Sequence, residues 1–334
     1  MPVFVIIGAF IGAGFASGEE MYLFFYRFGK NGIWGLLISS LLMGIIIYKT
    51  CSIVLKKDIK SYQMFLEETL KNKKLAKITN IFITIFLLSI FFIMVSGFGA
   101  YFSQEFGKSP ILGAILLAGS CFIVLLNNIK GVTKVSSIVV PLLIICTIII
   151  SIINIRQMNF NNTFNLLIEN SEISLWWLLQ SFLYCSYNMV AMIPVLVNLR
   201  KYIKNKEQII GISIISSFII FILGISIFLL LTNIQIDLNT LEMPAVYAIS
   251  NYFPQFRVIY GIVILLAIFT TAISDGNSFL QNVVKNKKYY PHIAGIMCIS
   301  SIIISNFGFS NLVEFVFPLF GYFGIIQIIN ILIS

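Results

Sequence analysis

Charged residues are scarce in this sequence: they make up 10% of its 334 residues, whereas 59% are hydrophobic. A soluble domain has nearer one quarter charged residues. A chain this apolar cannot bury all of its hydrophobic surface in the core of one soluble domain, so its composition excludes an ordinary soluble domain. The net charge of +9 could suggest nucleic acid. The basic residues, however, lie in short segments between hydrophobic runs, and we expect no nucleic-acid partner.

Histidine is almost absent, and the cysteines show no metal-ligand spacing. The chain has one histidine, His292, and five cysteines that lie in or beside apolar runs. We interpret these cysteines as small buried hydrophobic residues. The sequence also has no HExxH motif, no cluster of histidine and carboxylates, and no nucleophile motif with a base in reach. We therefore expect that the protein is not an enzyme.

Long hydrophobic runs recur from end to end. A helix of about 20 apolar residues crosses a hydrocarbon core of ~30 Å. We predict ten such spans, at residues 2–25, 31–55, 78–106, 110–126, 138–155, 175–199, 209–232, 258–284, 291–307 and 312–333. The sequence thus predicts an all-α integral membrane protein with a single transmembrane domain over residues 1–334, embedded in a lipid bilayer. We also predict two short surface helices, at 62–70 and 241–253, and no cleavable signal peptide.

Lysine and arginine are distributed unevenly between the loops. The loops after spans 2, 4, 6 and 8 carry 16 of them, and the opposite loops carry five. The positive-inside rule then places both termini in the cytoplasm. The polar stretch 156–174 separates two halves, 1–155 and 173–334, of five spans each. An odd number of spans makes the halves enter the membrane in opposite senses, which is the layout of an inverted repeat.

Residues 8–20, GAFIGAGFASGEE, place four glycines and two carboxylates inside the first span. Glycine weakens a helix by about 1 kcal/mol relative to alanine and lets a ligand approach the backbone closely. Unwound backbone survives in a membrane only when it is buried in protein or faces a wet cavity. We predict a break near Gly12, where free N–H groups favour an anion and free carbonyls suit a cation. Close helix packing through Gly8 and Gly12 is the alternative, but it does not explain Glu19 and Glu20.

The matching span of the second half is polar at its centre, which reads LYCSYNM over residues 183–189. Polar groups at this depth usually face a cavity or a partner. We predict a second helix break here, with Ser186 and Asn188 supplying hydrogen bonds and with Tyr184 and Tyr187 walling a pocket. A polar contact between helices is the alternative, because no glycine is present.

Span 8 carries Ala267, Thr270, Thr271 and Ser274 on one helical face. Threonine hydroxyls, with a carbonyl freed from the helix, are hard oxygen ligands that suit Na⁺. Threonine that bonds back to its own helix is the alternative. Asp275 follows directly, and it could face a pathway, pair with a lysine or cap a break.

Taken together, residues 8–20 resemble the first-helix signature of the bacterial YkvI-type membrane proteins, and YCSYN at 184–188 resembles their sixth helix. That group is similar to a branch of the amino acid–polyamine–organocation superfamily, whose members share the LeuT fold of five plus five inverted helices. The resemblance implies broken helices 1 and 6 and a place in the bacterial inner membrane. The missing glycines of the sixth helix depart from the pattern of many relatives and leave the pocket shape open.

The resemblance also assigns roles to residues. It implies a sodium site formed by the backbone carbonyls of Gly8, Ile11 and Ala267 and the hydroxyls of Thr270 and Thr271. It places a substrate carboxylate against the backbone around Gly12, Ala13, Gly14 and Phe15. It makes span 3, with Phe98 and Tyr101, another wall of the pocket.

Three functions follow as hypotheses. The first is a secondary active transporter that couples sodium to an amino acid or a similar small zwitterion by alternating access. The second is a proton-coupled or uncoupled exchanger of small organic solutes on the same fold, with Glu19, Glu20 or Asp275 in gating or proton coupling. The third is a receptor or scaffold that does not transport, which the small amount of sequence outside the spans disfavours.

Overall fold

The computed structural model describes residues 2–127, 130–157 and 175–333, and every regular element within these ranges is helical. Seven segments there are long and apolar enough to cross a membrane. They are built on α4 (Lys30–Lys56), α6 (Lys73–Phe106), α10 (Trp176–Asn198), α11 (Lys206–Leu231), α13 (Arg257–Val283), α14 (Tyr290–Ile304) and α15 (Phe309–Ile333). The protein is therefore an all-helical, multi-pass membrane protein, as the composition predicts.

The other three predicted spans fall on helices that are not among these seven segments. Span 2–25 coincides with α1 (Pro2–Phe10), α2 (Ala13–Ser17) and α3 (Glu19–Phe24), and the next two fall on α7 (Pro110–Asn127) and α8 (Lys130–Gln157). α7 and the part of α8 from Ile144 to Arg156 are apolar but shorter. The count of ten spans stays a prediction.

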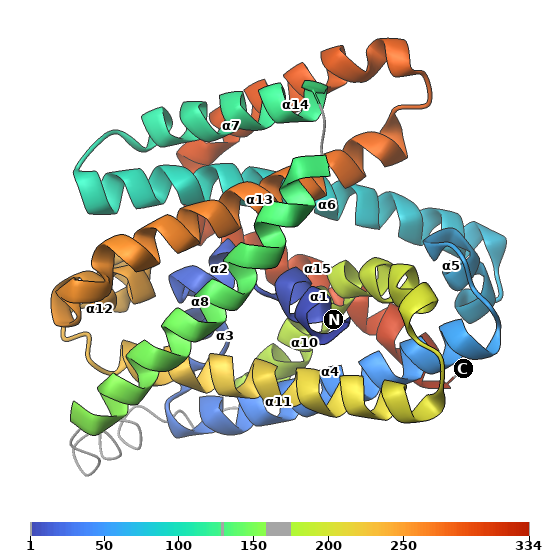
Figure 1. Ribbon diagram of the computed structural model, residues 1–334, viewed down its shortest axis with the longest axis horizontal. Helices are drawn as coiled ribbons and strands as arrows, with labels where there is room; N and C mark the ends of the chain where they lie inside the picture. The colour runs from blue at the N-terminus through green and yellow to red at the C-terminus, as the bar shows by residue number, and fades with distance from the viewer. Residues whose placement is uncertain (1, 128–129, 158–174, 334) are drawn as a thin grey trace.

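Helices of the first half pack against helices of the second half. Contacts join α1 to α10, α4 to α11, α6 to α13, and α7 to α14. Figure 1 shows three of these pairs as successive layers, with α7 and α14 at the top, α6 and α13 below them, and α4 and α11 at the bottom. Each pair joins helices at equivalent places in the two predicted halves, which agrees with an inverted repeat. The dividing stretch 156–174 lies almost wholly outside the described residues, and the LeuT-type repeat stays a prediction.

The first span is broken at two glycines. α1 ends at Phe10, and Gly12 has an extended backbone (φ −100°, ψ −174°) before α2 begins. Gly18, between α2 and α3, lies in the left-handed region at φ +84°, which favours glycine. A Cβ atom at Gly18 would also lie 2.9 Å from the backbone nitrogen of Ala245. The break near Gly12 is confirmed, and the structure adds a second one six residues later.

The predicted break in the sixth span is wrong. α10 runs without interruption from Trp176 to Asn198, with Pro194 inside it. The Asn188 side-chain amide donates to the Tyr184 carbonyl one turn earlier at 2.9 Å, and the Ser181 hydroxyl donates to the Trp177 carbonyl. Polar side chains that donate to a carbonyl of their own helix use their hydrogen-bonding capacity without ending the helix. Without glycine, the polarity at the centre of this span does not unwind the backbone.

The two predicted surface helices are present and lie at opposite ends of the molecule. α5 (Tyr62–Leu70) begins after Ser61, whose hydroxyl accepts from the Met64 backbone N–H. α12 (Pro244–Tyr252) begins with proline in its first turn, a position where a missing N–H has no cost. Figure 1 shows α5 at the right and α12 at the left, with the long helices running between them.

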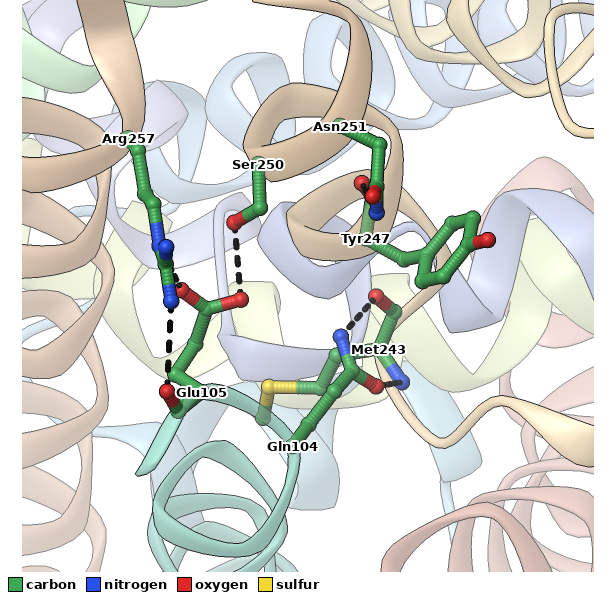
Figure 2. Close-up of polar contacts among 7 residues, drawn as sticks. All are labelled: Gln104, Glu105, Met243, Tyr247, Ser250, Asn251 and Arg257. Carbon is green, nitrogen blue, oxygen red and sulfur yellow. Dashed lines mark hydrogen bonds and ion pairs between the residues drawn. The ribbon is translucent and has the colours of Figure 1, made fainter. Parts of the chain in front are cut away.

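Polar contacts hold α12 to the ends of α6 and α13, as Figure 2 shows. The Gln104 side-chain amide donates to the Met243 carbonyl at 3.0 Å and accepts from the Met243 N–H at 3.2 Å. The Glu105 carboxylate accepts from the Ser250 hydroxyl at 2.7 Å and from Arg257 Nε at 2.8 Å. These bonds fix α12 over the broken first span, because α12 also contacts α2 and α3.

Candidate functional site

A cavity of about 660 Å³ lies beside the break in the first span. Its walls come from α1, α3, α6, α8, α10, α13 and α15. Ten of the predicted site residues line it: Gly8, Ile11, Gly12, Glu20, Tyr187, Asn188, Ala267, Thr270, Thr271 and Asp275. The fold thus brings together the whole predicted sodium set, part of the predicted pocket and two of the three predicted coupling carboxylates.

The cavity lies on the N-terminal side of the break. Its α1 wall includes Phe4 and Val5, which are 55% and 38% exposed. Towards α12 the chain is closed, because every residue from 13 to 21 is buried. The Tyr260 hydroxyl donates to the Ala16 carbonyl there, and Gly18 packs on Ala245 of α12. If both termini are cytoplasmic, as the loop charges predict, this is the cytoplasmic half of the protein.

The break releases backbone oxygens at the cavity wall. The Gly12 N–H donates to the Phe10 carbonyl at 3.1 Å, instead of to the Gly8 carbonyl that a continuous helix would use. In the same way, within this described segment the Ala16 N–H donates to the Gly12 carbonyl, but the Phe15 N–H does not donate to the Ile11 carbonyl. The Gly8 and Ile11 carbonyls, both predicted sodium ligands, therefore lack their helical donors in this described segment.

The opposite wall carries the two threonines of α13. The Thr270 hydroxyl donates to the Ala267 carbonyl at 3.1 Å, so the local bond that the sequence left as an alternative is present. That bond uses the hydroxyl hydrogen and leaves the oxygen lone pairs available. The residues thus offer oxygens of the kind that Na⁺ prefers: two freed carbonyls and two hydroxyls.

Glu20 folds back over the second half of the broken span. Its carboxylate accepts from the Tyr187 hydroxyl at 2.5 Å, which joins α3 to α10. A Cβ atom placed on Gly14 would overlap Glu20 Oε1, so the carboxylate lies directly on the Gly14 backbone. The Phe15 backbone amide interacts with the same carboxylate. The position predicted for a substrate carboxylate is therefore held by the protein's own Glu20.

Aromatic rings surround the Glu20 carboxylate and the cavity. Tyr187 stacks on Phe317, with ring centroids 4.5 Å apart and planes inclined by 8°. Phe10, Phe86 and Phe4 also line the cavity. Among the lining residues, which include Pro141 of α8, the charged side chains are the carboxylates Glu20 and Asp275, and lysine, arginine and histidine do not occur.

Comparisons with known proteins identify relatives over almost the whole chain. The membrane protein YkvI of Bacillus subtilis is 29% identical over 329 residues, which cover 96% of this chain and 91% of the relative. YyaD of Bacillus subtilis is 25% identical over 333 residues, which cover 98% of this chain and 94% of that protein. No family model matches the chain. Each match covers more than nine tenths of both proteins, so the similarity is not confined to one segment.

The chain resembles the YkvI-type membrane proteins.

Several predicted pocket residues lie away from the cavity. Tyr184 is fully buried among Phe10, Phe24 and Phe25. Ser186 faces α15, where a Cβ atom on Gly324 would lie 2.8 Å from the Ser186 carbonyl. Because α10 is an unbroken helix, the residues of 184–188 point in different directions, and only Tyr187 and Asn188 reach the cavity.

The predicted residues of span 3 and Glu19 lie at the closed end. Phe98 stacks on Phe102, and the Tyr101 hydroxyl lies on Gly261 of α13, where a Cβ atom would overlap it. Glu19 is 2% exposed, and its Oε2 has no hydrogen-bond partner among the described residues. Ala13, Gly14 and Phe15 are buried behind Glu20 and do not line the cavity.

The sequence analysis missed the part of α6 that does line the cavity. Phe86, Ile90 and Met94 form this wall, and they are spaced four residues apart on one helical face. That spacing was readable from the sequence, but many apolar stripes in a membrane helix share it. Phe98 and Tyr101, which were predicted from the same span, lie further along α6 and pack against its neighbours instead.

Proposed function

We propose that this protein is a secondary transporter that moves a small organic solute together with sodium by alternating access. The release of the Gly8 and Ile11 carbonyls into the cavity that Thr270 and Thr271 line carries the proposal. Unpaired backbone oxygens at membrane depth are costly, and a bound cation accounts for their exposure. The closure towards α12 and the opening on the N-terminal side support one state of an alternating-access cycle.

The test is sodium-dependent stability of the purified protein. A cation that binds only the folded state raises stability by RT ln(1 + [Na⁺]/Kd), about 1.4 kcal/mol at ten times Kd. We expect NaCl to raise the unfolding midpoint above that in equal KCl, and Thr270→Ala/Thr271→Ala to remove most of the difference.

A matched control is Thr84→Ala/Thr232→Ala. These threonines also bond back to their own helices, at 2.8 and 2.7 Å, but neither lines the cavity. The control should keep the full sodium response. An equal response in both double variants would rule out sodium at this place.

The second candidate is a proton-coupled or uncoupled exchanger. The observation in its favour is that Glu20 and Asp275 line the same cavity as the threonines. Uptake by reconstituted protein that follows a pH gradient, ignores sodium and is abolished by Asp275→Asn would favour this exchanger over the sodium symporter.

A further inference from the structure

Three hydrogen-bond donors of the cavity wall are already engaged within the protein, and the hydroxyls of Thr271 and Ser274 are the other side-chain hydroxyls of this wall. The Tyr187 hydroxyl donates to Glu20, an Asn188 amide hydrogen to the Tyr184 carbonyl, and the Thr270 hydroxyl to the Ala267 carbonyl. The backbone amides around Gly14, which a solute carboxylate would need, lie behind the Glu20 side chain. A solute carboxylate would therefore find the neutral hydroxyls of Thr271 and Ser274 as donors, and none that carries a positive charge among the described lining residues.

Hydrogen-bond acceptors, in contrast, are plentiful and include two carboxyl groups. Asp275 lines the cavity, and within the described part of the chain it has no hydrogen-bond or ion-pair partner. Glu20 is 4% exposed and lines the same space. A carboxylate held by a Tyr187 hydroxyl that donates to it is arranged as an acceptor.

The apolar part of the wall also suits a cation. Faces of Phe, Tyr and Trp attract ammonium groups, most strongly where water is excluded. Phe10, Phe317 and Tyr187 stand around the Glu20 end of the cavity, and Phe86 lies on its α6 wall. Aromatic rings combined with carboxylates, and without lysine or arginine, match an organic ammonium ion better than a zwitterion.

We propose that the transported solute is an organic cation carrying an ammonium group and no required carboxylate, because Glu20 fills the place that a solute carboxylate would occupy. This inference rests on the proposed transport function and names its substrate class. It departs from the amino acid that the sequence resemblance implies. Glu20 and Asp275 would bind the ammonium group, and the aromatic rings would cover its alkyl part.

The experiment uses two pairs of probes that share an ammonium group and differ by a carboxylate. Choline is compared with glycine betaine, and ethanolamine with glycine, in thermal unfolding and direct binding to the purified full chain. We expect the two cations to raise the unfolding midpoint and the two zwitterions to leave it unchanged. Glu20→Gln and Asp275→Asn should each weaken cation binding by roughly tenfold or more, since each removes a charge-assisted contact.

Glu314→Gln is the control, because Glu314 is 60% exposed at its side chain and lies outside the cavity. It should bind both cations as the unchanged protein does. Stronger binding of glycine or betaine than of their cationic partners would overturn the inference, as would no response to any probe in protein that still responds to sodium. Failure of the proposed sodium-coupled transport would give a different result from failure of this inference. In that case sodium would stabilise the protein no more than potassium does.

Discussion

At the scale of single residues, Glu105 shows how one carboxylate can join three segments. It lies in the last turn of α6, accepts from Ser250 of α12 and pairs with Arg257 at the start of α13 (Figure 2). Its side chain is 6% exposed, so these bonds replace water almost completely. Glu314 pairs with Arg27 at 3.5 Å, but its side chain is 60% exposed, and such surface pairs contribute little.

These two glutamates give a direct comparison. Glu105→Ala should lower the free energy of unfolding by about 1–2 kcal/mol, because it removes acceptors from a nearly dry site. Glu314→Ala should change it by less than about 0.5 kcal/mol. Chemical unfolding in detergent measures both. Equal effects would mean that the contacts around Glu105 do not hold α12 in place.

At the scale of elements, the first span depends on two glycines for different reasons. Gly12 is extended, with nothing within 4 Å of a Cβ atom there, so the break does not follow from crowding at this residue. Gly18 combines a left-handed backbone with contact to α12. The second turn therefore couples the geometry of the broken span to the position of α12.

Gly107 separates these two contributions, because it is also left-handed (φ +61°) but has no atom within 4 Å of a Cβ position. Gly107→Ala should destabilise the protein by about 1–2 kcal/mol, the cost of the backbone conformation alone. Gly18→Ala should cost roughly 2–4 kcal/mol, because the added methyl also overlaps Ala245. Thermal unfolding of both variants measures the difference. Equal losses of stability would show that α12 can move away from the added methyl group without a cost in free energy.

At the scale of the whole molecule, α5 and α12 mark its two ends (Figure 1). The loop charges predict that α5 is cytoplasmic and α12 external. The chain suits a labelling test, since its five native cysteines are all buried. Lys74 and Asn251 are exposed at the two ends.

In intact cells, a membrane-impermeant maleimide should label Asn251→Cys and leave Lys74→Cys unlabelled. After the membrane is opened, both should react. The reverse pattern in intact cells would place both termini outside, and the cavity would then open to the external side. The unsubstituted protein controls for reaction of the native cysteines.

The sequence by itself determined the membrane class and the breaking of the first helix. Composition limits the environments in which so apolar a chain can fold, and the glycines of residues 8–20 act locally, through backbone freedom. The same local reasoning placed α5 and α12, whose starts depend on neighbouring residues such as Ser61 and Pro244.

Only the tertiary structure decided which polar residues meet. α10 stayed helical because Asn188 bonded within its own helix, and this turned Tyr184 and Ser186 away from the cavity. Glu20 lies against Gly14 across the left-handed turn at Gly18, and no residue pattern in the sequence predicts that contact. Local breaks follow from propensities of a few adjacent residues, whereas the contents of a cavity depend on how helices distant in sequence pack together.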